Sequence, residues 1–191
     1  MLKVGDVLDM GPFQITLTVK QFTDETLDVE MELGPRSGGT PIHIHPHALE
    51  TYEVLEGRFD AYVDGIWRTY QAGEKFEVPK GVPHAFRNSS DAKTRVYNTH
   101  QPALKMAQYF EGLHKIAHSG VTKNGEVTFR AMLYLSLLMM SFKDEIIPIG
   151  PRPLPMCWDS SANWQVIGSD SALGQLQNVE TITPIRHCEG G

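Results

Sequence analysis

The chain has 191 residues, 41% of them hydrophobic, which suits one domain, or one domain with an appendage, and a sizeable core. Its formal net charge of -6 provides no basic field to gather phosphates, so we expect no nucleic-acid partner. The two cysteines, Cys157 and Cys188, fit neither a disulfide framework nor a CxxC metal site, and the first residues lack the apolar core of a signal peptide, so we expect a protein of the reducing cytoplasm.

Residues 13–100 have the pattern of short β-strands. Apolar and polar side chains alternate over 13–19 and 27–33, which is typical of strands with one buried face. Further strands are predicted at 51–57, 58–65, 66–71, 75–79 and 95–100. Turn residues separate these strands, with Asp64 and Gly65 predicted to form a tight hairpin turn. Many short strands with glycine and proline turns indicate a sandwich or a barrel.

The pattern changes to a helical one after Pro102, which can occupy the first position of a helix. Apolar side chains then recur at helical spacing from Ala103 to Ala117, and we predict a helix over these residues. A second helix is predicted over 128–145. Its apolar centre is too short to span a bilayer and is flanked by charges, so we expect no membrane partner and a buried or dimer-packing helix.

The stretch after the second helix, 146–155, is expected to be extended because its prolines forbid a helix. No element is predicted for the remaining residues up to the C-terminus.

The candidate functional residues are a group of histidines together with one glutamate. His43 and His45 stand two apart, so on a strand they project to the same side. Glu50 begins the next strand, which we expect to return antiparallel and bring the carboxylate beside the two imidazoles. His84 opens a later strand after a proline and glycine turn and supplies a fourth group. Imidazoles and a carboxylate in this pattern indicate a metal site.

The other histidines are expected to lie apart from the cluster. Pro46 should break the strand before His47. His100 ends the last predicted barrel strand, and we expect it to be exposed to solvent rather than to support the site. His114 and His118 lie four apart on a helix with no third ligand evident, so we expect a surface pair.

Two motifs in this region resemble those of the cupin superfamily. The first motif, G-x5-H-x-H-x(3,4)-E-x6-G, is matched by His43, His45, Glu50 and Gly57. Its leading glycine is displaced by one or two positions toward the first histidine, where Gly38 and Gly39 stand. This shift affects a turn and no ligand.

The second motif, G-x5-P-x-G-x2-H-x3-N, is matched in full by Gly73, Pro79, Gly81, His84 and Asn88. The resemblance covers roughly the first hundred residues and implies a mainly β fold, a double-stranded β-helix or jelly-roll barrel with the metal inside. We therefore predict a cupin barrel domain over 1–102, and C-terminal α-helices with an irregular tail over 103–191. The family's metal ligands carry over to His43, His45, Glu50 and His84.

Three imidazoles and one carboxylate suit one divalent ion, Fe, Mn, Ni or Zn, and an octahedral shell leaves two positions open for chemistry. We therefore predict a metal-dependent enzyme acting on a small organic molecule, similar to cupin dioxygenases or isomerases. Tyr52 shares the strand face of Glu50 and is the candidate catalytic residue. Two alternatives are a non-catalytic protein that binds a sugar or carboxylate, and a structural metal site in an assembly protein.

The helical extension must bury its own apolar faces. We predict a homodimer, because the apolar centre of the second helix needs a partner surface. Between a lid over the barrel mouth and an assembly element on the outside of the barrel, the absence of a glycine hinge in this helix favours assembly.

Overall fold

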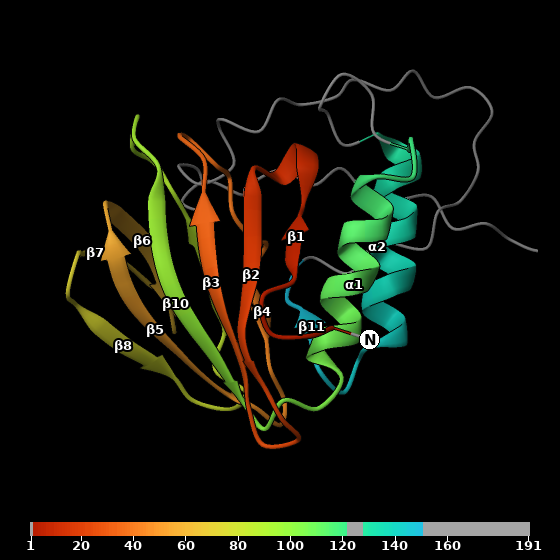
Figure 1. The fold of residues 1–191 in the computed structure, drawn as a ribbon, viewed down its shortest axis with the longest axis horizontal. Coiled ribbons are helices and arrows are strands. Elements are labelled where there is room, and N and C mark those ends of the chain that lie inside the picture. The colour runs from red at the N-terminus through yellow and green to blue at the C-terminus, as the bar shows by residue number, and fades with distance from the viewer. Residues whose placement is uncertain (1, 122–127, 151–191) are drawn as a thin grey trace, which may run out of the picture. The chain divides into compact units, whose positions relative to one another are not determined.

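The computed structural model describes residues 2–121 and 128–150. Two antiparallel sheets are followed by two helices, with the helices side by side next to strand β1 (Figure 1). This architecture confirms the predicted mainly β class, a double-stranded β-helix with C-terminal helices. The predictions that concern residues 151–191 lie outside the described residues.

One sheet has six strands in the order β1-β2-β3-β10-β5-β8. Their bounds are Val7–Asp9 for β1, Ile15–Phe22 for β2, Leu27–Leu33 for β3, Thr94–Gln101 for β10, Leu49–Glu56 for β5 and Lys75–Val78 for β8. The other sheet has five strands in the order β11-β4-β9-β6-β7. Their bounds are Ile147–Pro148 for β11, His43–Ile44 for β4, His84–Arg87 for β9, Arg58–Val63 for β6 and Ile66–Gln71 for β7.

The core follows from the alternation of apolar side chains along the strands. Strand β10 pairs with β3 on one edge and with β5 on the other, and this places Val96 opposite both Met31 and Val54. All three side chains are buried. Each such side chain stabilises the fold by about 1.5–3 kcal/mol when it leaves water. The same alternation that builds this core also directs the functional side chains into the interior.

The hairpin between β6 and β7 turns at Asp64 and Gly65, as predicted. Both residues have positive φ, 48° and 91°, which is what a two-residue turn of this kind requires. The turn fixes the register in which Val63 lies opposite Ile66.

Helix α1 spans Met106–Ala117 and α2 spans Phe129–Ser141, with a short 3-10 helix at Gly11–Phe13. The predicted start of the first helix after Pro102 is wrong. Leu104 has φ 45°, a left-handed conformation that cannot belong to a right-handed helix, so α1 begins only beyond it. The Thr128 side chain caps α2 by accepting from the backbone N–H of Ala131 at 3.2 Å.

The chain after α2 returns to the barrel. Ile147 and Pro148 lie in the stretch predicted to be extended and form β11, which pairs antiparallel with β4, with Ile147 opposite Ile44 and Pro148 opposite His43. None of the helices in the described residues has both the length and the hydropathy to cross a membrane. The predicted division between a barrel of 1–102 and an extension of 103–191 stays a prediction.

Gly39 lies close against the backbone of β9, and this contact leads to a prediction about stability. Its φ is +70°, and a Cβ atom there would lie 1.6 Å from the carbonyl oxygen of Phe86. Gly39→Ala should therefore lower the free energy of unfolding by more than about 2 kcal/mol, measured by urea denaturation. Gly38→Ala is the matched control, since a Cβ at Gly38 meets no atom within 4 Å. Equal stability of the two variants would contradict the prediction.

Candidate metal centre

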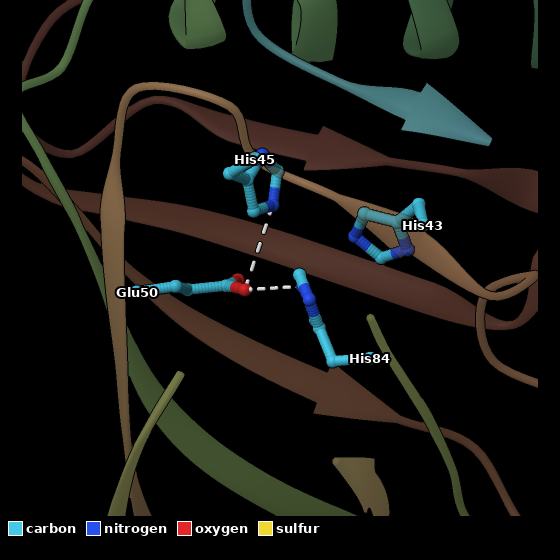
Figure 2. A group of neighbouring side chains, drawn as sticks. All are labelled: His43, His45, Glu50 and His84. Atoms are coloured by element: carbon cyan, nitrogen blue, oxygen red, sulfur yellow. Dashed lines mark ion pairs between the residues drawn. The ribbon is translucent and has the colours of Figure 1, made fainter. Parts of the chain in front are cut away.

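Four side chains meet in the interior between the two sheets (Figure 2). His43 lies on β4 and His84 at the start of β9, directly opposite each other in the register of one sheet. His45 follows β4, and Glu50 comes from β5 in the other sheet. Their ligand atoms all lie within 4.8 Å of one another, and all four residues are buried. The structure thus brings together the four residues that the sequence singled out.

The route by which Glu50 reaches the histidines differs from the prediction. We expected its strand to pair antiparallel with the strand of His43 and His45. Instead β4 pairs with β9 and β11, whereas β5 pairs with β10 and β8. The connection between β4 and β5 carries the chain from one sheet to the other, so Glu50 faces the histidines across the interior of the barrel.

Backbone carbonyl groups fix the orientation of all three imidazoles. The Nδ1 atoms of His43 and His84 lie 2.8 Å and 2.9 Å from the carbonyl oxygens of Pro41 and Val82. Nδ1 of His45 lies 2.6 Å from the carbonyl oxygen of Glu145. A carbonyl oxygen only accepts, so each Nδ1 carries the proton and each Nε2 keeps a free lone pair. This is the arrangement in which histidine binds metals.

The Glu50 carboxylate is held at one oxygen and left free at the other. Its Oε1 accepts from Nδ2 of Asn98 at 2.9 Å and lies 3.1 Å from Nε2 of His100. Its Oε2 lies 2.8 Å from Nε2 of His84 and 3.5 Å from Nε2 of His45 (Figure 2). Apart from this short contact with each other, Oε2 of Glu50 and Nε2 of His84 are buried without a hydrogen-bond partner. Buried polar atoms without partners are uncommon, and a cation shared among these lone pairs would satisfy them together.

The pKa shifts of His43 and Glu50 agree with this interpretation. Burial lowers the pKa of His43 to about 3, with His84 and His45 adding to the shift, so this imidazole is neutral at physiological pH. Burial acts to raise the pKa of Glu50, but His100 and His45 hold it well below its usual range, so the carboxylate stays charged. Burial acts to lower the pKa of His84, but the neighbouring Glu50 carboxylate raises it above its ordinary value, so a metal would have to displace a proton there. Once deprotonated, the three imidazoles and the carboxylate form a donor set that divalent Fe, Mn, Ni and Zn accept.

A cavity of about 220 Å³ opens beside His43, His45 and Glu50. Part of its lining consists of helix residues, Met106, Tyr109, Phe110 and Leu113 from α1 and Leu135 and Met139 from α2. The expectation that the helical extension packs only on the outside of the barrel is therefore wrong. The helices are apolar on more than one side, so they can cover the cavity and still present apolar side chains elsewhere.

Tyr52 lies on β5 and is buried, with its ring stacked on Phe76 at 4.8 Å between centroids. Burial raises the pKa of its hydroxyl group well above the usual range, and the neighbouring Glu50 raises it further. Tyr52 is not among the residues that line the cavity. Its catalytic role stays a prediction.

His100 was missed by the sequence reasoning. We expected it to be exposed, but it is buried on β10 directly opposite Glu50. The reason is that β10 lies between two other strands and turns every second residue inward, so Val96, Asn98 and His100 share the interior face. The alternation of side chains along this strand was the sequence signal that could have predicted the burial of His100. His47 is exposed as expected, and His114 and His118 lie together near the surface, where both contact the carbonyl oxygen of Asp9.

The comparison with protein families decides which fold family surrounds this site. The family model of the cupin domain matches residues 29–100, which include all four clustered side chains. The chain contains a cupin domain. Two solved structures are similar, a cupin described as RmlC-like from Shewanella frigidimarina and KdgF from a Halomonas species. The first is 25% identical with a TM-score of 0.47, covering 52% of this chain and 85% of the other, and the second is 22% identical with a TM-score of 0.49, covering 53% and 90%.

Two curated relatives match parts of the cupin domain. Protein SchB of Streptomyces halstedii is 33% identical over 54 residues, which are 28% of this chain and 39% of SchB. Quercetin 2,3-dioxygenase of Bacillus subtilis is 26% identical over 68 residues, which are 36% of this chain and 20% of that enzyme. The match thus spans less than half the length of each curated relative.

The hydrogen bond between His45 and Glu145 connects the extension to the cupin site and can be tested. Ile149→Pro removes the N–H that donates to the carbonyl oxygen of Ile42 at 2.8 Å and should loosen β11, which follows the turn that contains Glu145. Zn(II) affinity, measured by competition with a chromophoric chelator, should fall about 10- to 100-fold.

Ile149→Ala is the control for this experiment, because it keeps the backbone N–H and removes only a partly exposed side chain. Its Zn(II) affinity should match that of the wild type. If Ile149→Pro also binds Zn(II) as tightly as the wild type while folded by circular dichroism, the Glu145 carbonyl does not orient His45.

Proposed function

We propose that this protein is a metal-dependent enzyme of the dioxygenase type, acting on a small organic molecule, with His43, His45, Glu50 and His84 as metal ligands. One observation carries the proposal. Apart from their contact with each other, two ligand atoms, Oε2 of Glu50 and Nε2 of His84, are buried without a hydrogen-bond partner in a cluster that borders a cavity. The similarity to quercetin 2,3-dioxygenase over part of the domain supports the reaction type.

A divalent Fe, Mn, Ni or Zn ion would supply Lewis acidity, and iron would also supply redox chemistry toward dioxygen. The chain's own groups prepare the site for it. Asn98 and His100 hold Oε1 of Glu50, which leaves Oε2 directed toward the histidines. The helices wall the cavity with apolar side chains, and this would keep water from a bound substrate.

The two alternatives differ in how well they fit the cavity. A structural metal site is normally closed by its protein ligands, whereas three of the four ligands here border a cavity. A non-catalytic protein that binds a carboxylate is the second candidate. One observation favours it: Glu50 is the only carboxylate among the described residues that line the cavity. Since Glu50 is a proposed metal ligand, a catalytic acid or base would have to be a side chain other than a carboxylate.

The metal assignment is tested by elemental analysis of the purified protein. About one divalent ion per chain is expected, and His84→Ala should lower the occupancy sharply because it removes one of four ligands. His47→Ala is the matched control, since His47 lies two residues beyond His45 but is exposed. An undiminished metal content in folded His84→Ala would contradict the ligand set.

Turnover is tested with the same two variants. The protein loaded separately with Fe(II), Mn(II), Ni(II) or Zn(II) is incubated with a metabolite extract in air, and mass spectrometry follows each compound. A compound that the loaded wild type and His47→Ala consume, and His84→Ala does not, identifies an enzyme. Compounds retained by the protein but never converted would favour the binding alternative.

We further propose a homodimer in which a second copy of the chain covers the outer side of α2. Phe129 and Met140 on this helix are 76% and 73% exposed, and large exposed apolar groups mark interaction surfaces. The expected cytoplasmic location stays a prediction as well, since both cysteines lie outside the described residues.

Light scattering should give twice the chain mass of 21.4 kDa at micromolar concentration. The double variant Phe129→Glu and Met140→Glu should be monomeric and still bind metal. Ile66→Glu introduces the same charge at an exposed apolar residue on β7 and should stay dimeric. A monomeric wild type would refute the dimer, and a dimeric double variant would place its interface elsewhere.

A further inference from the structure

The cavity is lined by two chemically different groups of residues. One group is polar and comprises His43, His45, Glu50, Asn98 and His100. The helix residues in the lining are apolar except for the hydroxyl group of Tyr109. None of the described residues that line the cavity is a lysine or an arginine. A phosphorylated ligand would therefore find no cationic side chain to pair with its charge.

The size of the cavity restricts the ligand further. Pockets for drug-sized ligands measure about 300–1,000 Å³, whereas this cavity measures about 220 Å³. A sugar, whose hydroxyl groups each need a hydrogen-bond partner, would leave most of them unpaired against methionine, leucine and phenylalanine side chains. The cavity therefore suits a compact molecule whose body is apolar.

Tyr109 is the polar exception on the helical side. It lies on α1, is only 5% exposed and lines the cavity, so a polar group of a bound molecule can reach its hydroxyl group. Burial raises the pKa of Tyr109 above its ordinary value, so the hydroxyl group stays neutral and able to donate. Buried tyrosine hydroxyl groups normally find a partner.

We infer that the cavity binds a compact, largely apolar molecule with an oxygen donor at its metal-facing end, and that Tyr109 hydrogen-bonds a second polar group of that molecule. The inference rests on the proposed metal site. Helices α1 and α2 are then the selective part of the site, because they supply both the apolar wall and this hydroxyl group. Tyr109 contacts the substrate from outside the strands of the barrel.

Neighbouring residues on α2 provide matched variants for a test. Leu135 lines the cavity and is half-buried, whereas Leu137 is 51% exposed and does not line it. Met139 and Met140 form a second pair of the same kind, with Met139 lining the cavity and Met140 exposed. Alanine at the first residue of each pair removes a contact with the ligand, and alanine at the second removes an equal volume elsewhere.

The probes are hydroxamates, which present the same oxygen pair to a metal on bodies of different size. Calorimetry on the Zn(II)-loaded full chain should show benzohydroxamate binding at least about tenfold more tightly than acetohydroxamate, because it buries a phenyl ring in place of a methyl group. Leu135→Ala and Met139→Ala should reduce this ratio several-fold. Leu137→Ala and Met140→Ala should leave it unchanged.

Tyr109→Phe removes only the hydroxyl group and separates a ligand contact from a structural role. At least one of 3-hydroxy- and 4-hydroxybenzohydroxamate should bind the wild type more tightly than benzohydroxamate, and Tyr109→Phe should abolish that preference. The thermal midpoint of the ligand-free variant should stay close to that of the wild type, since the proposed hydrogen bond forms only with the ligand. A lower midpoint with an unchanged preference would show a structural tyrosine and refute its role.

The outcomes also separate this inference from the proposed function. A wild type that takes up no Zn(II), or that binds neither hydroxamate when loaded, would refute the open metal site and the inference with it. A loaded wild type that binds both hydroxamates equally would refute only the inference about an apolar ligand and leave the metal site intact. His84→Ala should bind neither probe.

Discussion

The burial of the Glu50 carboxylate is the constraint on which the rest of the site depends. A charge removed from water costs several kcal/mol unless nearby groups compensate for the lost hydration. The structure supplies these groups from both sheets: Asn98 and His100 come from β10 beside Glu50, and His84 comes from β9 across the interior. Compensation is complete at Oε1 and incomplete at Oε2. The folded barrel therefore holds a negative charge that is only partly compensated. The uncompensated oxygen faces the three imidazoles, where a cation could bind.

Much of this arrangement was predictable from the sequence because it depends on local periodicity. His43 and His45 share a face through the two-residue repeat of a strand, and the turn at Asp64 and Gly65 follows from residues that tolerate positive φ. These features need no knowledge of the partner strand. The pairing of β4 was predicted wrongly because local periodicity does not show which strands pair. Strand partners depend on contacts between residues distant in the sequence.

The parts that were missed are those that depend on tertiary structure. The position of β10 between two other strands buries His100, and the sequence shows the parity of His100 with Val96 and Asn98 but not which strands lie beside β10. The start of α1 depends on the left-handed backbone of Leu104, a residue with good helix propensity. The carbonyl group of Glu145 is invisible to any motif, because every residue carries one.

This last contact changes what counts as the smallest complete unit of the site. Residues 29–100 contain every side chain of the cluster, yet the third histidine anchor comes from a backbone 100 positions further along than His45. A protein trimmed to the recognisable motif region would retain the ligand side chains while losing β11, the apolar helical wall and the carbonyl group that aims one imidazole. Transplanting the four ligands onto another barrel would meet the same difficulty. The chemistry belongs to the barrel together with the segment that returns to it.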